Sequence, residues 1–265
     1  MAEFSVKRQR GFVTVALICF VALYAPIITL VFYSFNAGSN LAVWEGFSVR
    51  WYLSAWENEQ VQEAAIRSVV VAFWASLLAT TFATLAALGT TRTPPYRGLT
   101  AVYALINQPL MVPEIVTGVA LLIVFAVVKE ATGFHGLFYL IAAHTAFCIP
   151  FAYLPIRARL EGMDTTLETA AADLYATPWE TFRRITLPLM APGIIAGAML
   201  AFVISLDDVV ITEFVKSAGQ DTLPTYMLGQ LRRVVTPEVN AISSALLAIS
   251  ILIVSLFFLV TRKRR

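Results

Sequence analysis

The chain has 265 residues, of which 58% are hydrophobic and only 14% charged, and its mean hydropathy is +0.75. Soluble domains carry roughly 25% charged residues, so this composition excludes an ordinary soluble globular protein. A net charge of +2 gives no reason to expect a nucleic-acid partner. The two cysteines define neither a disulfide framework nor a metal site.

Six long tracts contain few or no charged residues. Each can hold the ~20 apolar residues that a helix needs to cross a bilayer, and none shows the polar stripe of a soluble helix. The first tract exceeds the ~7–15 apolar residues of a signal peptide, so we expect it to be retained. The sequence therefore predicts an all-α integral membrane protein with one transmembrane domain, 1–265, whose spans cover about 12–35, 66–90, 99–128, 137–156, 191–213 and 239–261.

Lysine and arginine predict the orientation of these spans. Most of them lie at the two ends of the chain and in the segments 91–98 and 157–190. Because cytoplasmic loops are enriched in basic residues, both termini and the loop 157–190 are expected in the cytoplasm. Segments 36–63 and 217–238 then face outward and carry aromatic residues such as Trp44, which fit either an interfacial belt or a surface for an outside partner.

Three carboxylates lie within the expected spans: Glu114, Asp207 and Asp208. An ionised Asp at the centre of a membrane helix costs about 2.5–3.5 kcal/mol on insertion scales, so such residues face a cavity, a partner or a protein interface. Glu114 follows Pro109 and Pro113, which remove backbone donors. Irregular backbone at membrane depth is tolerated where it is buried in protein or lines water. The third span is thus a candidate wall of a solute pathway.

Adjacent residues on a helix point about 100° apart, so Asp207 and Asp208 cannot both face one cation from one surface. Either one of them faces the pathway and the other a neighbouring helix, or the helix ends near Leu206. Small residues at i, i+4 spacing, Gly193, Gly197 and Ala201, predict close packing of the fifth span on another helix. His144, in the fourth span, is expected to be a structural histidine.

The loop 157–190 predicts two short helices. Thr165 to Leu174 contains good helix formers and Asp164 can cap its start. Pro178 suits the first turn of a second helix, which the pair Leu187-Pro188 is expected to end before the fifth span. Such a loop is typical of a protein-binding element, although a plain surface hairpin is the alternative.

The chain contains no G-x-x-x-x-G-K-[ST] phosphate loop and no Ser/His/Asp set. We therefore expect no catalytic residue, no metal ligand and no cofactor in this chain, which is predicted not to be an enzyme. ATP and Mg²⁺ would be bound by a separate ATPase subunit.

The loop resembles the EAA loop of ABC importer permeases. The similarity rests on Ala170-Ala171, the turn position Tyr175, and Ile185, Leu187 and Pro188. YSFN at 33–36, WEGFSVRWY at 44–52, AHTAFCIPF at 143–151, SLDDVV at 205–210 and TPEVNA at 236–241 are similar to the second (C-type) permease subunit of spermidine/putrescine importers, which are binding-protein-dependent inner-membrane transport systems. These pieces cover most of the chain in the expected order.

The resemblance implies the six-helix type I importer permease fold in a bacterial inner membrane. It implies a homologous second permease, an ATPase dimer, a periplasmic or extracellular substrate-binding protein and a polyamine substrate. Independently of the resemblance, the acids within the spans and the outward-facing aromatic residues give the expected pathway residues, Glu114, Asp207, Asp208 and Trp44. The implied ATPase-coupling residues are Glu168, Thr169, Ala170, Ala171, Asp173, Tyr175, Leu187 and Pro188.

The loop departs from the family pattern at two positions. The motif's Glu falls at Thr169, with Glu168 one residue early, and its Gly falls at Tyr175. Because Gly accepts a positive φ and Tyr does so with strain, the coupling helix is expected either to end as in the family or to bend differently.

Two alternatives remain open from the sequence. A related permease would import another small solute, such as an opine, a sulfonate or ferric iron. A secondary transporter or channel would work without ATP, but it predicts inverted repeats, and residues 1–130 and 131–265 show no internal similarity.

Overall fold

The computed structural model describes residues 10–40, 43–133, 136–233 and 236–262. Over these ranges the chain is helical, and its one β-bridge joins Asn36 to Phe47. Six described helices are long and apolar enough to cross a membrane, in agreement with the six spans expected from the sequence. They cover Gly11–Tyr33, Glu59–Thr91, Glu114–Thr132, Phe138–Glu161, Pro178–Asp207 and Pro237–Ser255.

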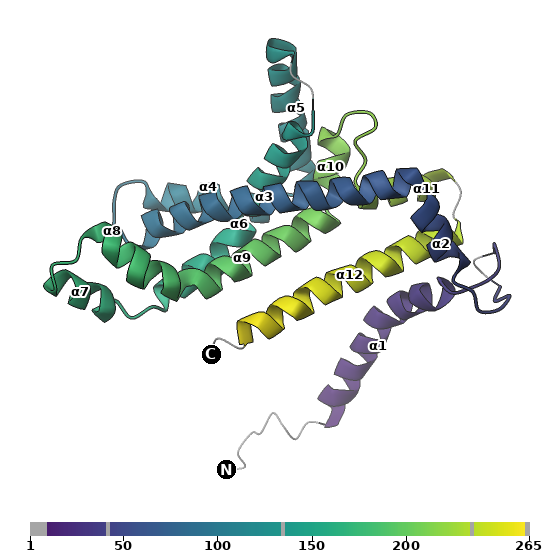
Figure 1. Ribbon diagram of the computed structural model, residues 1–265, viewed down its shortest axis with the longest axis horizontal. Helices are drawn as coiled ribbons and strands as arrows, with labels where there is room; N and C mark the ends of the chain where they lie inside the picture. Colours follow the sequence, from purple (N-terminus) through teal and green to yellow (C-terminus); the bar gives the residue numbers. More distant parts are fainter. Residues whose placement is uncertain (1–9, 41–42, 134–135, 234–235, 263–265) are drawn as a thin grey trace. The chain divides into compact units, whose positions relative to one another are not determined.

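The chain forms two compact units, described separately (Figure 1). Unit 1 comprises 1–62 and 227–253, and unit 2 comprises 63–226 and 254–265. Unit 1 contains α1 (Arg10–Tyr33), α2 (Arg50–Glu57) and most of α12 (Pro237–Arg262). Three of the described helices cross the boundary between the units, namely α12, α3 (Glu59–Thr91) and α11 (Leu223–Arg233).

Asn36 organises the loop between α1 and α2 in unit 1. Its side-chain Nδ2 donates to the carbonyl oxygens of Asn40 and Val43, at 3.1 and 2.7 Å. Its Oδ1 accepts from the backbone N–H of Glu45 at 2.8 Å, and its own carbonyl accepts from the Trp51 indole at 3.0 Å. Because Asn36 is buried, these bonds replace the water that its amide loses and hold the loop in one conformation.

Unit 2 is built around the pair α6 and α9, which lie side by side in Figure 1. Alanines 79, 83 and 87 of α3 join the same buried cluster at a spacing of four residues. The described helical segments that lie wholly within unit 2 include α6 and α9 themselves. They are α4 (Leu99–Met111), α5 (Glu114–Thr132), α6 (Phe138–Glu161), α7 (Thr166–Asp173), α8 (Pro178–Thr181), the π-helical η2 (Phe182–Thr186), α9 (Leu187–Asp207) and α10 (Val210–Val215).

Glycines bring α6 and α9 into close contact. A Cβ atom on Gly197 would lie 2.6 Å from the carbonyl oxygen of Ala152, and one on Gly193 would lie 2.7 Å from Cβ of Arg159. Ala201, one turn further along α9, is fully buried. The small-residue spacing seen in the sequence thus marks a true helix–helix interface.

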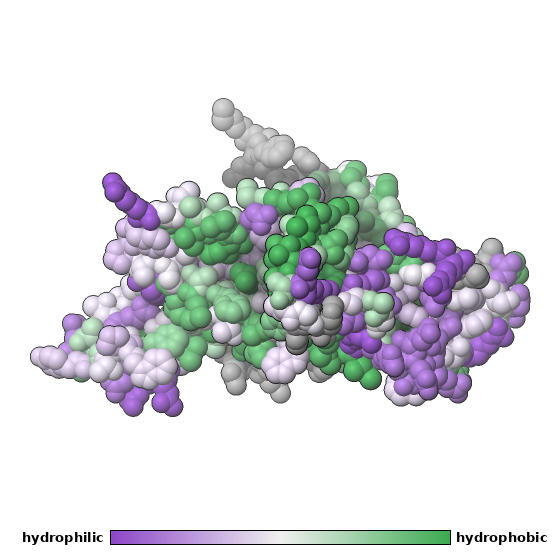
Figure 2. Space-filling model, turned by 90° about the horizontal axis from the view of Figure 1, so that it is seen from above, coloured by the Kyte–Doolittle hydropathy of each residue, from purple (hydrophilic) through white to green (hydrophobic). Residues whose placement is uncertain are grey.

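Much of the remaining helix surface is apolar and exposed. Along α1 most large side chains are more than half exposed, for example Phe12, Leu23 and Ile28. The space-filling view shows broad areas of hydrophobic side chains at the surface (Figure 2). Lipid covers such surfaces in a membrane protein, and the same surfaces can also receive partner subunits.

Candidate functional site

The third expected span is broken in two. Helix α4 ends at Met111, Val112 is extended (φ −96°, ψ 138°) and α5 begins at Glu114. Pro113 causes this break, because proline disfavours the α region for the residue before it. The break places the Glu114 carboxylate in the first turn of α5, where the helix dipole favours a negative charge. Figure 1 shows α5 leaving the direction of α4.

A second break lies at the pair of aspartates. Helix α9 ends at Asp207, Asp208 is extended (φ −64°, ψ 135°), and α10 begins at Val210. The Asp208 carboxylate accepts hydrogen bonds from the backbone N–H groups of Ile211 and Thr212, at 3.2 and 2.9 Å. Asp208 therefore caps the first turn of α10, and the fifth span expected over 191–213 is interrupted there.

His144 of α6 ties this break to the interior of unit 2. Its Nδ1 lies 2.8 Å from the Ser205 hydroxyl, and its Nε2 lies 2.9 Å from the Thr212 hydroxyl. The Thr212 hydroxyl donates to Asp208 at 2.9 Å, so its oxygen accepts from His144 and Nε2 carries the proton. Both ring nitrogens have partners and the ring is fully buried, which makes His144 a structural histidine.

The two aspartates differ in exposure. Asp208 is 6% exposed, whereas Asp207 is exposed. Glu114 is half-buried at the start of α5, and α5 packs against α10, the helix that Asp208 caps. Among the described residues, neither Glu114 nor Asp208 forms an ion pair with lysine or arginine. The two breaks therefore lie at neighbouring helices of unit 2, where Asp208 is buried and Asp207 is open to the surface.

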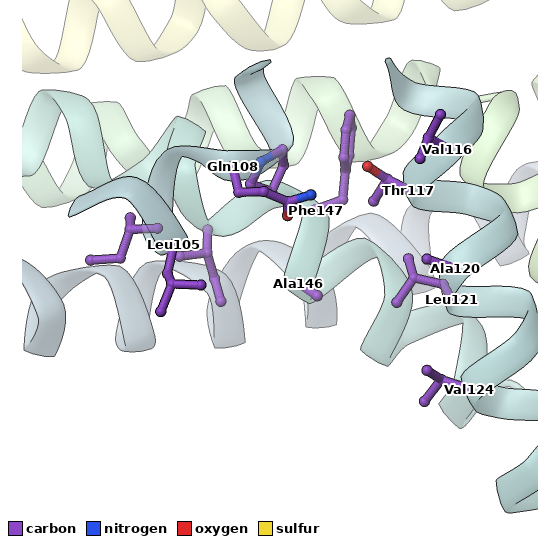
Figure 3. Close-up of a pocket in the computed structure, with 12 residues that line it drawn as sticks. Leu105, Gln108, Val116, Thr117, Ala120, Leu121, Val124, Ala146 and Phe147 are labelled. Atoms are coloured by element: carbon purple, nitrogen blue, oxygen red, sulfur yellow. The ribbon is translucent and has the colours of Figure 1, made fainter. Parts of the chain in front are cut away.

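A cavity of about 480 Å³ lies beside the first break, between α4, α5 and α6 (Figure 3). Its lining is apolar except for Gln108 and Thr117. The Thr117 hydroxyl oxygen is buried and has no hydrogen-bond partner among the described residues.

Trp44 belongs to unit 1, whereas the three acids belong to unit 2. Its ring stacks on Phe32, with centroids 4.4 Å apart, and meets Tyr33 edge-on at 6.3 Å. The side chain is 39% exposed. These contacts give Trp44 a fixed position on the loop, and its role in a pathway stays a prediction.

The loop 157–190 contains the two expected short helices. At the start of α7, Asp164 accepts from the Thr166 N–H at 2.9 Å, and this backbone hydrogen bond lowers the pKa of the Asp164 carboxyl. At the start of α8, Thr177 and Glu180 form a capping box, with Pro178 in the first turn. The predicted caps are present.

The expected helix end at Leu187-Pro188 is wrong. Helix α8 runs through the π-helical segment η2 directly into α9, and Pro188 lies in the first turn of α9. Proline is tolerated there because its missing N–H is not needed in a first turn, and the π turn before it supplies the change of register. The sequence contained the proline but gave no sign of the π turn.

Tyr175 adopts the conformation that the family motif assigns to glycine. Its φ is 58°, the one positive φ of a described non-glycine residue. The N–H of Tyr175 donates to the Ala172 carbonyl at 2.9 Å, and that of Ala176 donates to the Ala171 carbonyl at 3.0 Å. This is the Schellman pattern, so α7 ends with the geometry expected from the family despite the substitution.

Glu168 and Thr169 point in different directions. The carboxylate of Glu168 accepts from the Thr186 hydroxyl at 2.7 Å and lies 3.3 Å from Nε of Arg92. Thr169 is exposed and bonds only to the carbonyl of Thr165, one turn back. The sequence analysis missed Arg92 and Thr186, because no local spacing pattern relates residues so far apart in the chain.

A six-span helical fold with paired helix breaks and in-membrane acids defines a multi-pass membrane transport subunit. Residues 79–263 match the model of the family described as "Binding-protein-dependent transport system inner membrane component", and the chain belongs to this family. It is therefore an inner-membrane permease subunit of the ABC importer type.

Curated relatives match over most of the chain. It is 37% identical to the putrescine transport system permease protein PotI of Escherichia coli K12, over 93% of this chain and 89% of the relative. It is 40% identical to the spermidine/putrescine transport system permease protein PotC of Haemophilus influenzae, over 91% and 92%.

Solved structures share the fold. A bacterial alginate ABC transporter in complex with its alginate pentasaccharide-bound periplasmic protein superposes with a TM-score of 0.72 at 17% identity, covering 97% of this chain and 96% of that one. The MetNI methionine ABC transporter gives a TM-score of 0.62 at 18% identity, covering 78% and 98%. At such low identity these likenesses concern the fold alone.

Proposed function

We propose that this chain forms half of the translocation pathway of an ATP-driven importer for a polyamine such as putrescine or spermidine. The observation that carries the proposal is a pair of helix breaks in unit 2 that carry Glu114, Asp207 and Asp208, with no lysine or arginine paired to Glu114 or Asp208 among the described residues. A polyamine is a flexible cation, and carboxylates in a medium of low dielectric attract it strongly. The names of the relatives, which are putrescine and spermidine permeases, point to the same substrate class.

The three acids have different proposed roles. Asp208 has its oxygens occupied by the first turn of α10 and by Thr212, so it holds the shape of the break. Asp207 is exposed and forms no hydrogen bond or ion pair among the described residues, so it is the group that pairs transiently with the cation. Glu114 begins α5, three residues before Thr117, which lines the cavity, and it is proposed to meet the solute on that side. Trp44 is proposed to contact the solute or its binding protein on the outward side.

Energy is proposed to come from a separate ATPase dimer that binds ATP and Mg²⁺. Its contact surface on this chain is the cytoplasmic loop, where Leu174, Tyr175 and Trp179 are 81%, 95% and 65% exposed. Large exposed apolar side chains on a polar loop mark a protein interface. A homologous second permease would complete the pathway, and a substrate-binding protein would deliver the polyamine from outside.

The test is uptake by the purified complex, with its partner subunits, in liposomes. Labelled putrescine and spermidine should accumulate only with internal ATP, and each unlabelled polyamine should compete with the other. Competition by an opine, a sulfonate or ferric iron instead would favour a related importer. Uptake without any ATPase subunit would favour a secondary transporter.

Single substitutions test the roles of the acids. Asp207→Asn should lower uptake while the complex still assembles, because an exposed carboxylate adds little to packing. Asp208→Asn should lower assembly and uptake together. Normal uptake by the Asp207→Asn complex at low polyamine concentration would remove Asp207 from the pathway.

A further inference from the structure

Glu168 of α7 joins two segments that are far apart in the sequence. One carboxylate oxygen, Oε1, accepts from the hydroxyl of Thr186 at 2.7 Å, and the other, Oε2, lies 3.3 Å from Nε of Arg92. Arg92 directly follows α3, and Thr186 is the last residue of the π-helical segment before α9. A single side chain thus contacts the ends of two helices expected to span the membrane.

Helix α7 has few other attachments. Ala171 is its one buried residue. In the part of the chain that the structure describes, Glu168 makes the only side-chain hydrogen bond or ion pair that joins α7 to a distant segment, and another side-chain bond at α7 is the cap from the adjacent Asp164. The hydroxyl of Thr169 bonds within its own turn. Apart from the backbone at its two ends and the packing of Ala171, α7 is held by Glu168.

The partners of Glu168 have no ready replacement for it. The Arg92 side chain is 22% exposed, and its buried Nε and Nη2 atoms have no hydrogen-bond partner among the described residues. Glu168 therefore supplies the negative charge beside a largely desolvated guanidinium. Removing one member of such a pair leaves an uncompensated charge, which is costly. Thr186 is 5% exposed, so its hydroxyl also depends on Glu168.

The position of Thr186 gives the contact a mechanical consequence. A π-helical turn is a local change of register inside a helix and is common at functional sites. Helix α9 then runs for 21 residues from this turn to Asp207, a distance of about 30 Å at 1.5 Å per residue. A displacement of α7 is passed through Glu168 to the base of α9 and to the end of α3.

We infer that Glu168 is a positioning residue that transmits the movement of the coupling loop to α3 and α9, and not a contact to the ATPase. This inference rests on the proposed function of the loop. Oε1 is hydrogen-bonded to Thr186, Oε2 faces Arg92 and the side chain is only 20% exposed, so the carboxylate is directed into the chain and not toward a partner protein. Thr169, exposed at the position of the motif's Glu, is the residue turned toward the ATPase.

The experiment compares three variants of the complete complex in liposomes. Glu168→Gln keeps the size of the side chain and removes its charge. The double variant Arg92→Glu with Glu168→Arg restores a pair of opposite sign. Glu161→Gln is the matched control, because Glu161 forms an exposed ion pair with Arg157 at 2.7 Å on one helix surface, and such pairs contribute little.

We expect Glu168→Gln to lower ATP-dependent putrescine uptake on the order of tenfold, the size of a typical coupling between sites. The ATPase should still copurify and hydrolyse ATP, so hydrolysis per transported molecule rises. The double variant should recover most of the uptake, and Glu161→Gln should match the unchanged complex. Normal uptake by Glu168→Gln, or a loss of ATPase copurification in step with uptake, would overturn the inference.

Amide hydrogen exchange over 166–173 measures how firmly Glu168 holds α7, independently of transport. Glu168→Gln should speed exchange in α7, and the double variant should slow it again. An unchanged exchange rate in Glu168→Gln would also overturn the inference. If the unsubstituted complex takes up no polyamine while the exchange result holds, the proposed function fails, but the conclusion that Glu168 holds α7 against α3 and α9 is kept.

Discussion

Gly197 of α9 and Ala152 of α6 are so close that a Cβ atom on Gly197 would lie 2.6 Å from the Ala152 carbonyl oxygen. A backbone oxygen in a helix cannot turn aside, so the two helices would have to separate. Gly197→Ala should therefore destabilise unit 2 by at least the ~1–3 kcal/mol typical of overpacking. Thermal unfolding of the complex in detergent measures this. Gly89→Ala is the control, because nothing lies within 4 Å of its Cβ position, and it should leave the midpoint unchanged or higher.

A Gly→Ala substitution at Gly118 of α5 adds the same methyl group, but the atoms that it would contact are able to move. A Cβ there would lie 2.8 Å from Cδ2 of Phe214 in α10, which is a side chain that can move. Gly118→Ala should thus cost less than Gly197→Ala, near the lower end of the ~1–3 kcal/mol range. Adding Phe214→Leu should recover most of the loss in the unfolding midpoint. No recovery in the double variant would mean that Phe214 is not the obstacle.

The sequence predicted the membrane class and the six spans because apolar length and basic loops are local properties. It also predicted the α6–α9 packing face, since Gly193, Gly197 and Ala201 repeat at helical spacing. It gave no sign of the π turn before Leu187, and it left a helix end near Leu206 as one of two alternatives, whereas the structure has α9 end at Asp207. Both features depend on tertiary contacts. Asp208 caps α10 by accepting from the backbone N–H of Thr212. The polar residue four positions after the aspartate is a local signal of this cap, but the same spacing also occurs in an uninterrupted helix.

The sequence alone could not predict which residues contact the acidic side chains. In the sequence, the two adjacent aspartates are equivalent. In the structure, His144 and Thr212 place Asp208 in the interior, and His144 also contacts Ser205, which is 61 residues away. Likewise, Glu168 resembles a displaced motif residue until Arg92 and Thr186 are seen around it. Long-range pairs of this kind leave no periodic pattern, so a single sequence assigns candidate residues but not their roles.

Thr212 is the link between His144 and Asp208, and its hydroxyl both accepts and donates. Thr212→Val keeps the shape of the side chain and leaves the His144 N–H without its near partner, at a cost of about 1–3 kcal/mol for a buried unsatisfied group. Thr212→Ser restores the hydroxyl and should recover most of that loss. The unfolding midpoint and the yield of assembled complex are the measurements. Equal midpoints for Thr212→Val and the unchanged chain would show that the chain of hydrogen bonds adds no stability.

Tyr175 stands at a position where glycine has no steric penalty. A non-glycine residue in the left-handed region costs about 1–2 kcal/mol, and the Tyr175 side chain is 95% exposed, so it returns no packing energy within the chain. Tyr175→Gly should therefore keep the end of α7 and stabilise the loop by up to about 1 kcal/mol, and its uptake should equal that of Tyr175→Ala, because both variants lose the ring that is proposed to contact the ATPase. Tyr175→Ala is the control, because it removes the ring and keeps the strain. Amide exchange over 166–177 and polyamine uptake are the measurements. A severe loss of uptake with Tyr175→Gly, but not with Tyr175→Ala, would show that the loop needs a different geometry when the ATPase is bound.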